Sequence, residues 1–316
     1  MEKITQIEEL KKLMVSFKES DRWSIQLLAI KNTKKNGISY YTREVVLRPQ
    51  NVLNELVGKI AENYCDVVSG LLNKRYERIE EYDGANIGRF IYRLDLRKGI
   101  AEDEYDRLIS AVNSPDVDSE IDVKKIKGYV ISGEVGDDKN VVRLILLQNP
   151  ISSYANRFRF IFGEDSFVKL DKDVLQLKDY VDVIIYKGYC YMMNLSAERL
   201  FDIERSYKAI CREKIDMIAE SDMVSDFEMF SKTASAGHNP RRFISFNQAH
   251  YERLVKEKKI RKEMGKTFNI DITPNGIFDT TDKKNSDNLV KLLCDRAMLE
   301  PFDRKPMEVE AAKAWS

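Results

Sequence analysis

The chain has 316 residues, of which 43% are apolar and 33% charged, a composition typical of globular rather than disordered proteins. Its 52 basic and 52 acidic residues give a formal net charge of zero, which argues against a histone-like protein that coats nucleic acid through bulk charge. The N-terminus has no signal-peptide pattern and no run approaches the ~20 apolar residues that span a bilayer, so we expect a cytosolic protein that reaches a membrane only through a partner.

The cysteines and histidines indicate neither a disulfide framework nor a metal site. The cysteines lie far apart and form no C-x-x-C pair, and two histidines are too few for a His-rich site. These residues are Cys65, Cys190, Cys211, Cys294, His238 and His250. No nucleotide-binding, hydrolase, zinc-protease or EF-hand motif occurs, so the sequence predicts no catalytic residue, no metal and no cofactor.

The first half of the chain alternates between predicted helices and strands. A capping box at Thr5 and Glu8 and apolar residues at helical spacing predict an amphipathic helix over residues 5–18. Strand-like runs at 23–31 and 39–47, separated by a turn-rich segment, predict a hairpin. The next predicted elements are a helical segment at 51–81, a strand at 89–96 and an acidic helix at 102–113.

A polar, acidic segment over residues 114–125 is the best candidate for a domain boundary. We therefore predict an N-terminal α/β lobe over 1–124, a second domain over 125–302 and a C-terminal tail over 303–316. The fold class that these elements predict is α+β, with two lobes and mixed, mostly antiparallel sheets flanked by helices.

The second half opens with strands and continues with helices. The clearest local pattern is a pair of β-branched and aromatic strands at 180–186 and 189–195, joined by the tight connection Lys187-Gly188. Other predicted strands lie at 128–135, 140–148, 157–162, 268–272 and 277–279. Predicted helices lie at 196–219, 222–234, 243–266 and 286–298.

Several segments of this half resemble a known bacterial family. They are DVIIYKGYCYMMN at 182–194, running into a helix with Leu200-Phe201-Asp202-Ile203, then NIDITPNGIFDT at 269–280 and NLVKLLCDRAMLEPF at 288–302. They resemble the KwaB family, the soluble subunits of the Kiwa antiphage defence system, over residues 125–302. The resemblance implies a cytosolic, homodimeric protein that binds DNA, acts with the membrane protein KwaA and blocks phage DNA replication or expression. It carries over no catalytic residue.

A basic run is the chemical feature that best fits nucleic acid. Nine basic residues face three glutamates over 241–266, after a small, polar loop at 233–240 that would let backbone amides approach a phosphate. The candidate DNA-binding residues are Arg241, Arg242, Arg253, Lys256, Lys258, Lys259, Arg261, Lys262 and Lys266. The alternative is that these charges form the solvated face of an ordinary helix.

Two weaker candidates stand beside this run. Residues 73–78 with Arg89, Arg93 and Arg97 would form a second basic patch in which Tyr76 stacks on a base, against the alternative of surface salt bridges. A metal-dependent nuclease would need clustered carboxylates, and the candidates are Asp182, Glu164 and Asp171 with Lys187. A non-catalytic adaptor without nucleic-acid contact is the remaining alternative.

Overall fold

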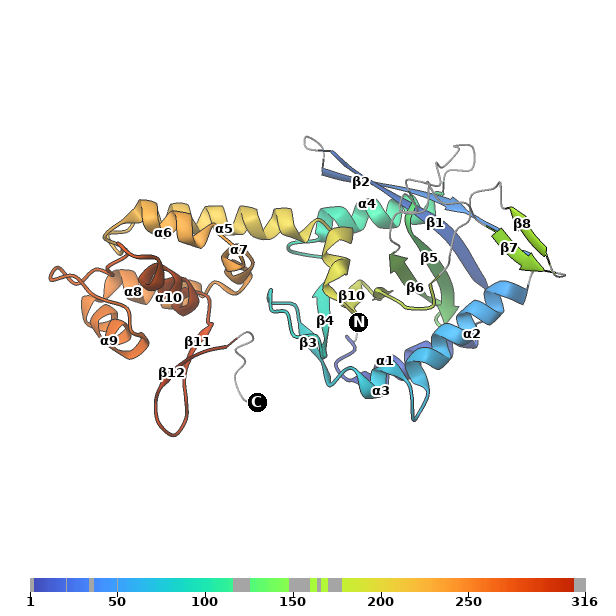
Figure 1. Ribbon diagram of the computed structural model, residues 1–316, viewed down its shortest axis with the longest axis horizontal. Coiled ribbons are helices and arrows are strands. Elements are labelled where there is room, and N and C mark those ends of the chain that lie inside the picture. Colours follow the sequence, from blue (N-terminus) through green and yellow to red (C-terminus); the bar gives the residue numbers. More distant parts are fainter. Residues whose placement is uncertain are drawn as a thin grey trace. The chain divides into compact units, whose positions relative to one another are not determined.

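A computed structural model describes residues 3–20, 22–33, 37–49, 51–115, 126–147, 160–163, 166–169 and 178–309. The chain divides into two compact units. The first comprises Met1–Glu81 and Gly88–Asp202, and the second comprises Tyr82–Ile87 and Ile203–Ser316. The fold is α+β, as the sequence predicts, with the sheet in the first unit and most of the helices in the second (Figure 1).

An eight-stranded sheet forms the centre of the first unit. Its strands, in spatial order, are β2 (Gly37–Glu44), β1 (Trp23–Thr33), β5 (Ile126–Val135), β6 (Asn140–Leu147), β9 (Val183–Tyr186), β10 (Tyr189–Met192), β4 (Phe90–Asp95) and β3 (Arg78–Glu81). Neighbours are antiparallel except β3 and β4, which are parallel. A separate hairpin pairs β7 (Phe160–Gly163) with β8 (Ser166–Lys169).

The predicted boundary near residue 124 is not where the structure divides. Strand β1 pairs with β5 from Trp23 opposite Gly133 to Ala29 opposite Ile126, so backbone hydrogen bonds join the two sides of that boundary. The division falls instead at Asp202 and Ile203, just before the helical unit. Residues 116–125 of the acidic segment lie outside the described residues.

Helices cover both faces of the sheet. Helices α1 (Ile7–Lys18) and α2 (Asn51–Cys65) bury apolar side chains against one face, together with sheet residues such as Ile131 and Leu144. Helix α4 (Glu102–Asn113) lies on the opposite face, where Gln26 donates to the carbonyl of Val112 at 3.0 Å. Because side chains alternate along a strand, β1 can supply apolar residues to one face and polar contacts to the other.

The hairpin of β9 and β10 is confirmed with the predicted two-residue turn. Lys187 and Gly188 both have positive φ, 50° and 78°, the conformation that matches the twist of a tight hairpin. A Cβ atom at Gly188 would lie 2.6 Å from Cδ of Arg97. The backbone conformation therefore favours glycine at this position, and a Cβ atom there would also displace the side chain of Arg97.

We expect Gly188→Ala to lower the free energy of unfolding by about 1–2 kcal/mol, because alanine is strained at positive φ. Gly58→Ala is the matched control, since Gly58 lies in helix α2, where an added Cβ atom would meet open space. That substitution should raise stability by about 0.5–1 kcal/mol. Urea unfolding of both variants measures the change in the free energy of unfolding. A change of the same sign in the two variants would contradict the role assigned to Gly188.

Three helical predictions in the first unit and at its end differ from the structure. The predicted helix at 51–81 ends at Cys65 and is followed by a short helix α3 (Leu71–Lys74) and by β3, because β3 pairs with β4. The N-terminal cap is shifted by one residue, with Glu9 accepting from the amides of Thr5 and Gln6. The predicted helix at 196–219 is divided into a 3-10 helix η3 (Leu195–Leu200), a break at Asp202 with φ 48°, and the helix α5 (Ile203–Ala219).

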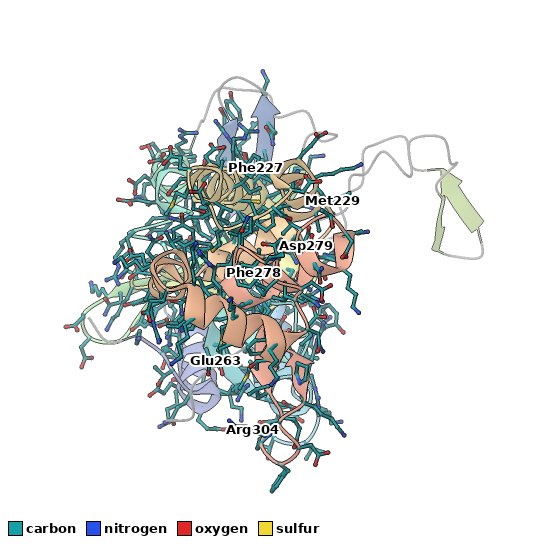
Figure 2. All side chains as sticks on the ribbon, turned by 90° about the vertical axis from the view of Figure 1, so that its left-hand side faces the viewer. Phe227, Met229, Glu263, Phe278, Asp279 and Arg304 are labelled. Atoms are coloured by element: carbon teal, nitrogen blue, oxygen red, sulfur yellow. The ribbon has the colours of Figure 1, made fainter. Side chains whose placement is uncertain are left out.

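The second unit is a bundle of helices with its own apolar core. Its helices are α5 (Ile203–Ala219), α6 (Phe227–Ala234), α7 (Asn239–Arg242), the 3-10 helix η4 (Phe243–Ser245), α8 (Gln248–Lys256), α9 (Lys258–Phe268) and α10 (Lys283–Leu293). Phe230, Phe243 and Phe278 are fully buried among them. Figure 2 shows the face of this unit that carries Phe278 and, on α9, Glu263.

Short β-structure replaces two further predictions in this unit. The predicted strands at 268–272 and 277–279 form only isolated bridges, in which Phe278 pairs with Ile272 and with Val224. The predicted helix at 286–298 ends at Leu293, and Asp295 has φ 52°. The chain then forms the hairpin of β11 (Ala297–Leu299) and β12 (Pro306–Glu308), the second strand of which lies within the predicted tail.

Candidate nucleic-acid interface

The basic run forms several helical pieces instead of the single predicted helix. Helix α8 is capped at its start by Asn247, whose side chain accepts from the amide of His250 at 3.0 Å. The chain then breaks at Glu257, where φ is −121° and ψ is 98°, before α9 begins. The break changes the direction of the chain, so the cations of the two helices do not continue one helical face.

Six of the nine predicted residues are exposed on α8 and α9. These residues, here called the lysine surface, are Arg253, Lys256, Lys258, Lys259, Lys262 and Lys266. Three exposed carboxylates lie in the same segment: Glu252 on α8, Glu257 between the helices and Glu263 on α9. The lysine surface therefore keeps an excess of positive charge at neutral pH.

Helical spacing brings three of these lysines onto one face of α9. Lys258, Lys262 and Lys266 follow one another at intervals of four residues. The aliphatic parts of Lys258 and Lys262 both lie beside Gly276, at 3.6 Å from the position that a Cβ atom would take there. The turn at residues 274–276 thus supports two neighbouring ammonium-bearing side chains.

Arg261 must be removed from the predicted DNA-binding set. Its side chain is buried, with 4% of the residue exposed, although its neighbours Lys259 and Lys262 are exposed. The guanidinium donates to the carbonyls of Gly276 at 2.8 Å and Leu254 at 3.0 Å. Burial lowers the pKa of Arg261, an effect that the charge of Asp222 opposes. This arginine joins α8, α9 and the following turn.

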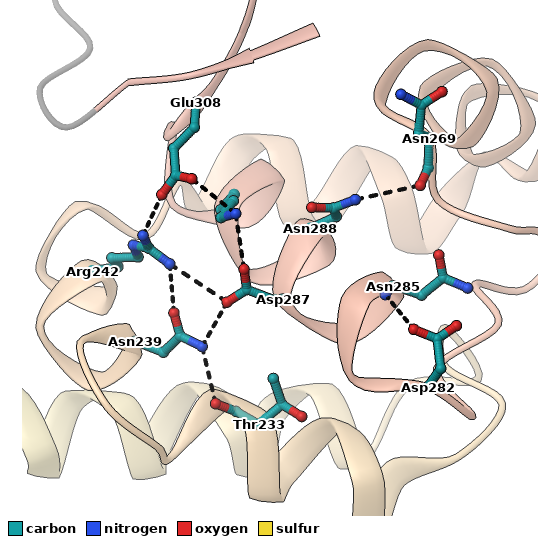
Figure 3. A network of polar contacts seen from close by, with 10 residues as sticks. Thr233, Asn239, Arg242, Asn269, Asp282, Asn285, Asp287, Asn288 and Glu308 are labelled. Atoms are coloured by element: carbon teal, nitrogen blue, oxygen red, sulfur yellow. Dashed lines mark hydrogen bonds and ion pairs between the residues drawn. The ribbon is translucent and has the colours of Figure 1, made fainter.

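Arg242 also has protein partners, in a network of polar side chains (Figure 3). Its guanidinium donates to Asn239 Oδ1 at 2.6 Å and to Glu308, and lies 3.5 Å from Asp287 Oδ1. Asn239 in turn donates to Asp287 and to the carbonyl of Thr233, both at 3.0 Å. Asn239, near the end of the polar loop at 233–240, therefore connects this loop to α10 through Asp287.

Lys291 completes this network and was not singled out by the sequence. Its ammonium lies 2.8 Å from Asp287 and 2.9 Å from Glu308. Burial raises the pKa of Asp287, but hydrogen bonds from Lys291 and Asn239 and the nearby positive charges outweigh it, so the pKa falls below its usual value. The i, i+4 spacing of Asp287 and Lys291 is a signal for this pair, whereas nothing in the sequence indicates Glu308.

We expect Asp287→Asn to lower the free energy of unfolding by about 1 kcal/mol at neutral pH. A carboxyl whose pKa is lower in the folded state stabilises above its unfolded pKa, and this contribution is lost as the pH falls through the folded value. The deficit of the variant should therefore shrink below about pH 4. Chemical unfolding across pH measures it, with Asp303→Asn, in an exposed pair with Lys305, as the control. A deficit that persists in acid would contradict the assignment.

The second predicted basic patch consists of structural contacts and salt bridges. Tyr76, proposed to stack on a base, is 5% exposed and donates to the carbonyl of Met193 at 2.8 Å. Arg89, Arg93 and Arg97 pair with carboxylates at 2.6, 2.7 and 2.9 Å. Tyr76 is thus unavailable for stacking, and the salt-bridge alternative describes this patch.

The nuclease candidates do not assemble a metal site within the described residues. Asp182 accepts from the amide of Leu147 and from the side chain of Asn194, both at 2.6 Å, so it joins β6 to the segment after β10. Glu164 and Asp171 lie outside the described residues. In the part of the chain that the structure describes, no group of three His, Cys, Asp or Glu side chains is placed to hold a metal ion.

These observations define a class of α+β protein, in which a large mixed sheet is followed by a helical unit with an exposed basic surface. None of the helices among the described residues is long and apolar enough to cross a membrane. A family model described as Kiwa protein KwaB-like matches residues 123–299. The chain belongs to this family, which makes it a component of Kiwa antiphage defence. Comparisons with curated proteins and with solved structures found no match.

The matched segment contains the whole lysine surface and all of the network around Arg242 except Glu308. It nearly coincides with residues 125–302, over which the sequence resembles the family, and it crosses the structural division at Asp202 and Ile203. The family segment therefore includes four strands of the large sheet, β5, β6, β9 and β10, together with most of the helical unit.

Proposed function

We propose that this protein is the DNA-binding effector of its Kiwa system and holds DNA through the lysine surface of α8 and α9. The observation that carries this proposal is the group of six exposed cations against three carboxylates, within the segment that matches the family. Ammonium and guanidinium groups contact phosphates without reading sequence, which suits an effector that must act on the DNA of many phages.

The same proposal includes the partners that act with the DNA-binding subunit. A homodimer would double the number of lysine surfaces, which strengthens binding to a long polymer through multivalency. The membrane protein KwaA would recruit this cytoplasmic chain to the inner membrane. Binding of phage DNA there would block replication or expression by occupying the template, without a catalytic step.

Gel retardation at increasing salt tests the proposal. If all six cations contact phosphates, the logarithm of the binding constant should fall with the logarithm of the salt concentration with a slope of about −5 on duplex DNA. Affinity should differ little between unrelated sequences. Magnesium-dependent degradation of plasmid DNA would instead indicate the nuclease alternative. Absence of retardation at low salt would favour an adaptor that does not contact nucleic acid.

A further inference from the structure

A small cavity in the second unit lies outside the lysine surface. It has a volume of about 170 Å³ and is lined by Gly84, Ala85, Asn86, His238, Arg241, Arg242, Arg296 and Val309. Three of these residues are arginines, and none of the lining residues is a carboxylate. The cavity thus gathers guanidinium groups from two distant parts of the sequence, α7 and the turn before β11.

Arg296 is held rigidly at this cavity. The residue is 2% exposed, and its guanidinium donates to the carbonyl of Asp83 at 2.7 Å and lies 3.3 Å from the carboxylate of the same residue. A guanidinium stays charged in proteins and presents its N–H groups in a fixed fork. A bound anion would therefore meet a cation that has already lost its side-chain freedom.

The loop at residues 82–87 forms another wall and is fixed against α7. Asp83 accepts from the amide of Ala85 at 2.9 Å, which closes a tight turn. Gly84 has φ 81°, and a Cβ atom there would lie 2.5 Å from the carbonyl oxygen of Arg241. The backbone of the loop thus approaches α7 as closely as a glycine allows, so the cavity wall is preorganised.

The size and charge of the cavity define its ligand. Pockets for whole drug-sized ligands have volumes of ~300–1,000 Å³, so this cavity admits one compact group. The planar fork of arginine matches the oxygens of phosphate. Three guanidinium groups favour a dianion with three terminal oxygens over the monoanionic diester inside a strand. Asp287 and Glu308 partly neutralise Arg242, and Asp83 partly neutralises Arg296. The guanidinium of Arg241 lies 5.7 Å from the centre of the Tyr207 ring, which carries no charge.

We propose that this cavity binds one phosphate monoester, as found at the 5′ end of a DNA strand or on a free nucleotide. The DNA-end source rests on the proposed DNA-binding function. The lysine surface would hold the strand through its internal phosphates, and the cavity would recognise the terminal one.

The test compares two oligonucleotides of one sequence, with a 5′-phosphate or a 5′-hydroxyl, on the full-length protein. The phosphorylated strand should bind at least about tenfold more tightly, the factor expected for one charge-assisted hydrogen bond. Arg241→Gln should abolish this ratio. Lys259 lies outside the cavity, so Lys259→Gln should lower the affinity for both oligonucleotides and leave the ratio of the two affinities unchanged. Binding of the hydroxyl strand alone reports the proposed function, so the two failures are distinguishable.

A second measurement needs no variant. Inorganic phosphate and a nucleoside 5′-monophosphate, but not the nucleoside, should protect the wild-type protein against thermal unfolding at constant ionic strength. Protection without a preference for the phosphorylated strand supports the cavity and assigns it to a free nucleotide. Equal binding of both strands together with no protection by either phosphate compound would overturn the proposal.

Discussion

Reversing four charges of the lysine surface is expected to lower the affinity for DNA by at least about 100-fold at low salt. The substitutions are Lys258→Glu, Lys259→Glu, Lys262→Glu and Lys266→Glu, all at exposed positions of α9. Each removes a cation that can contact a phosphate and adds a carboxylate that repels it. The slope of the logarithm of the binding constant against that of salt should also become shallower, because fewer counterions are released. Gel retardation or fluorescence anisotropy measures both quantities.

A second quadruple variant separates local contact from net charge. Lys12→Glu, Lys31→Glu, Lys59→Glu and Lys98→Glu change the charge of the protein by the same amount, at exposed positions of the first unit. These substitutions should leave most of the affinity and the slope unchanged. Equal losses in the two variants would show that only net charge matters. Unchanged affinity in the α9 variant, with its circular dichroism intact, would remove α9 from the interface.

Replacing Arg261 should destabilise the helical unit instead of weakening a phosphate contact. Arg261→Met removes the hydrogen-bond donor of three carbonyls, those of Gly276, Leu254 and Val255. An unsatisfied buried polar group costs ~1–3 kcal/mol, while removing a buried charge returns part of that cost. We expect the free energy of unfolding to fall by about 3 kcal/mol, measured as a lower urea midpoint with an unchanged m value.

Lys262→Met is the matched control for Arg261→Met. It removes the adjacent cation at an exposed position, so the free energy of unfolding should change by less than about 0.5 kcal/mol. Hydrogen exchange should locate the effect of Arg261→Met in α8 and α9, because the guanidinium joins these helices to the turn at Gly276. Equal stability of the two variants would contradict the structural role of Arg261.

Local patterns in the sequence were sufficient for the regular strands and for much of the basic surface. The strand pattern and the tight turn of β9 and β10 are set by residues that are close in the sequence. The same holds for the exposed lysines of α9, which recur at intervals of four residues. By contrast, the basic run could not show that Arg261 points into the protein. Lysine and arginine are equivalent in a charge count, but arginine has five N–H donors in a fixed planar fork, which suits it to bind several buried carbonyls at once.

The amino-acid sequence by itself determined the α+β class, the hairpins of β1 with β2 and of β9 with β10, the presence but not the bounds of most helices, and the family resemblance, because all of these follow from short-range periodicity and from contiguous motifs. Tertiary structure alone decided the place of the division, which depends on β1 pairing with β5 across the predicted boundary. It also decided which cations are exposed and which residues meet at the arginine cavity, where Asp83 and Arg296 are 213 positions apart. Contacts at such separations arise from chain folding, and no local preference encodes them.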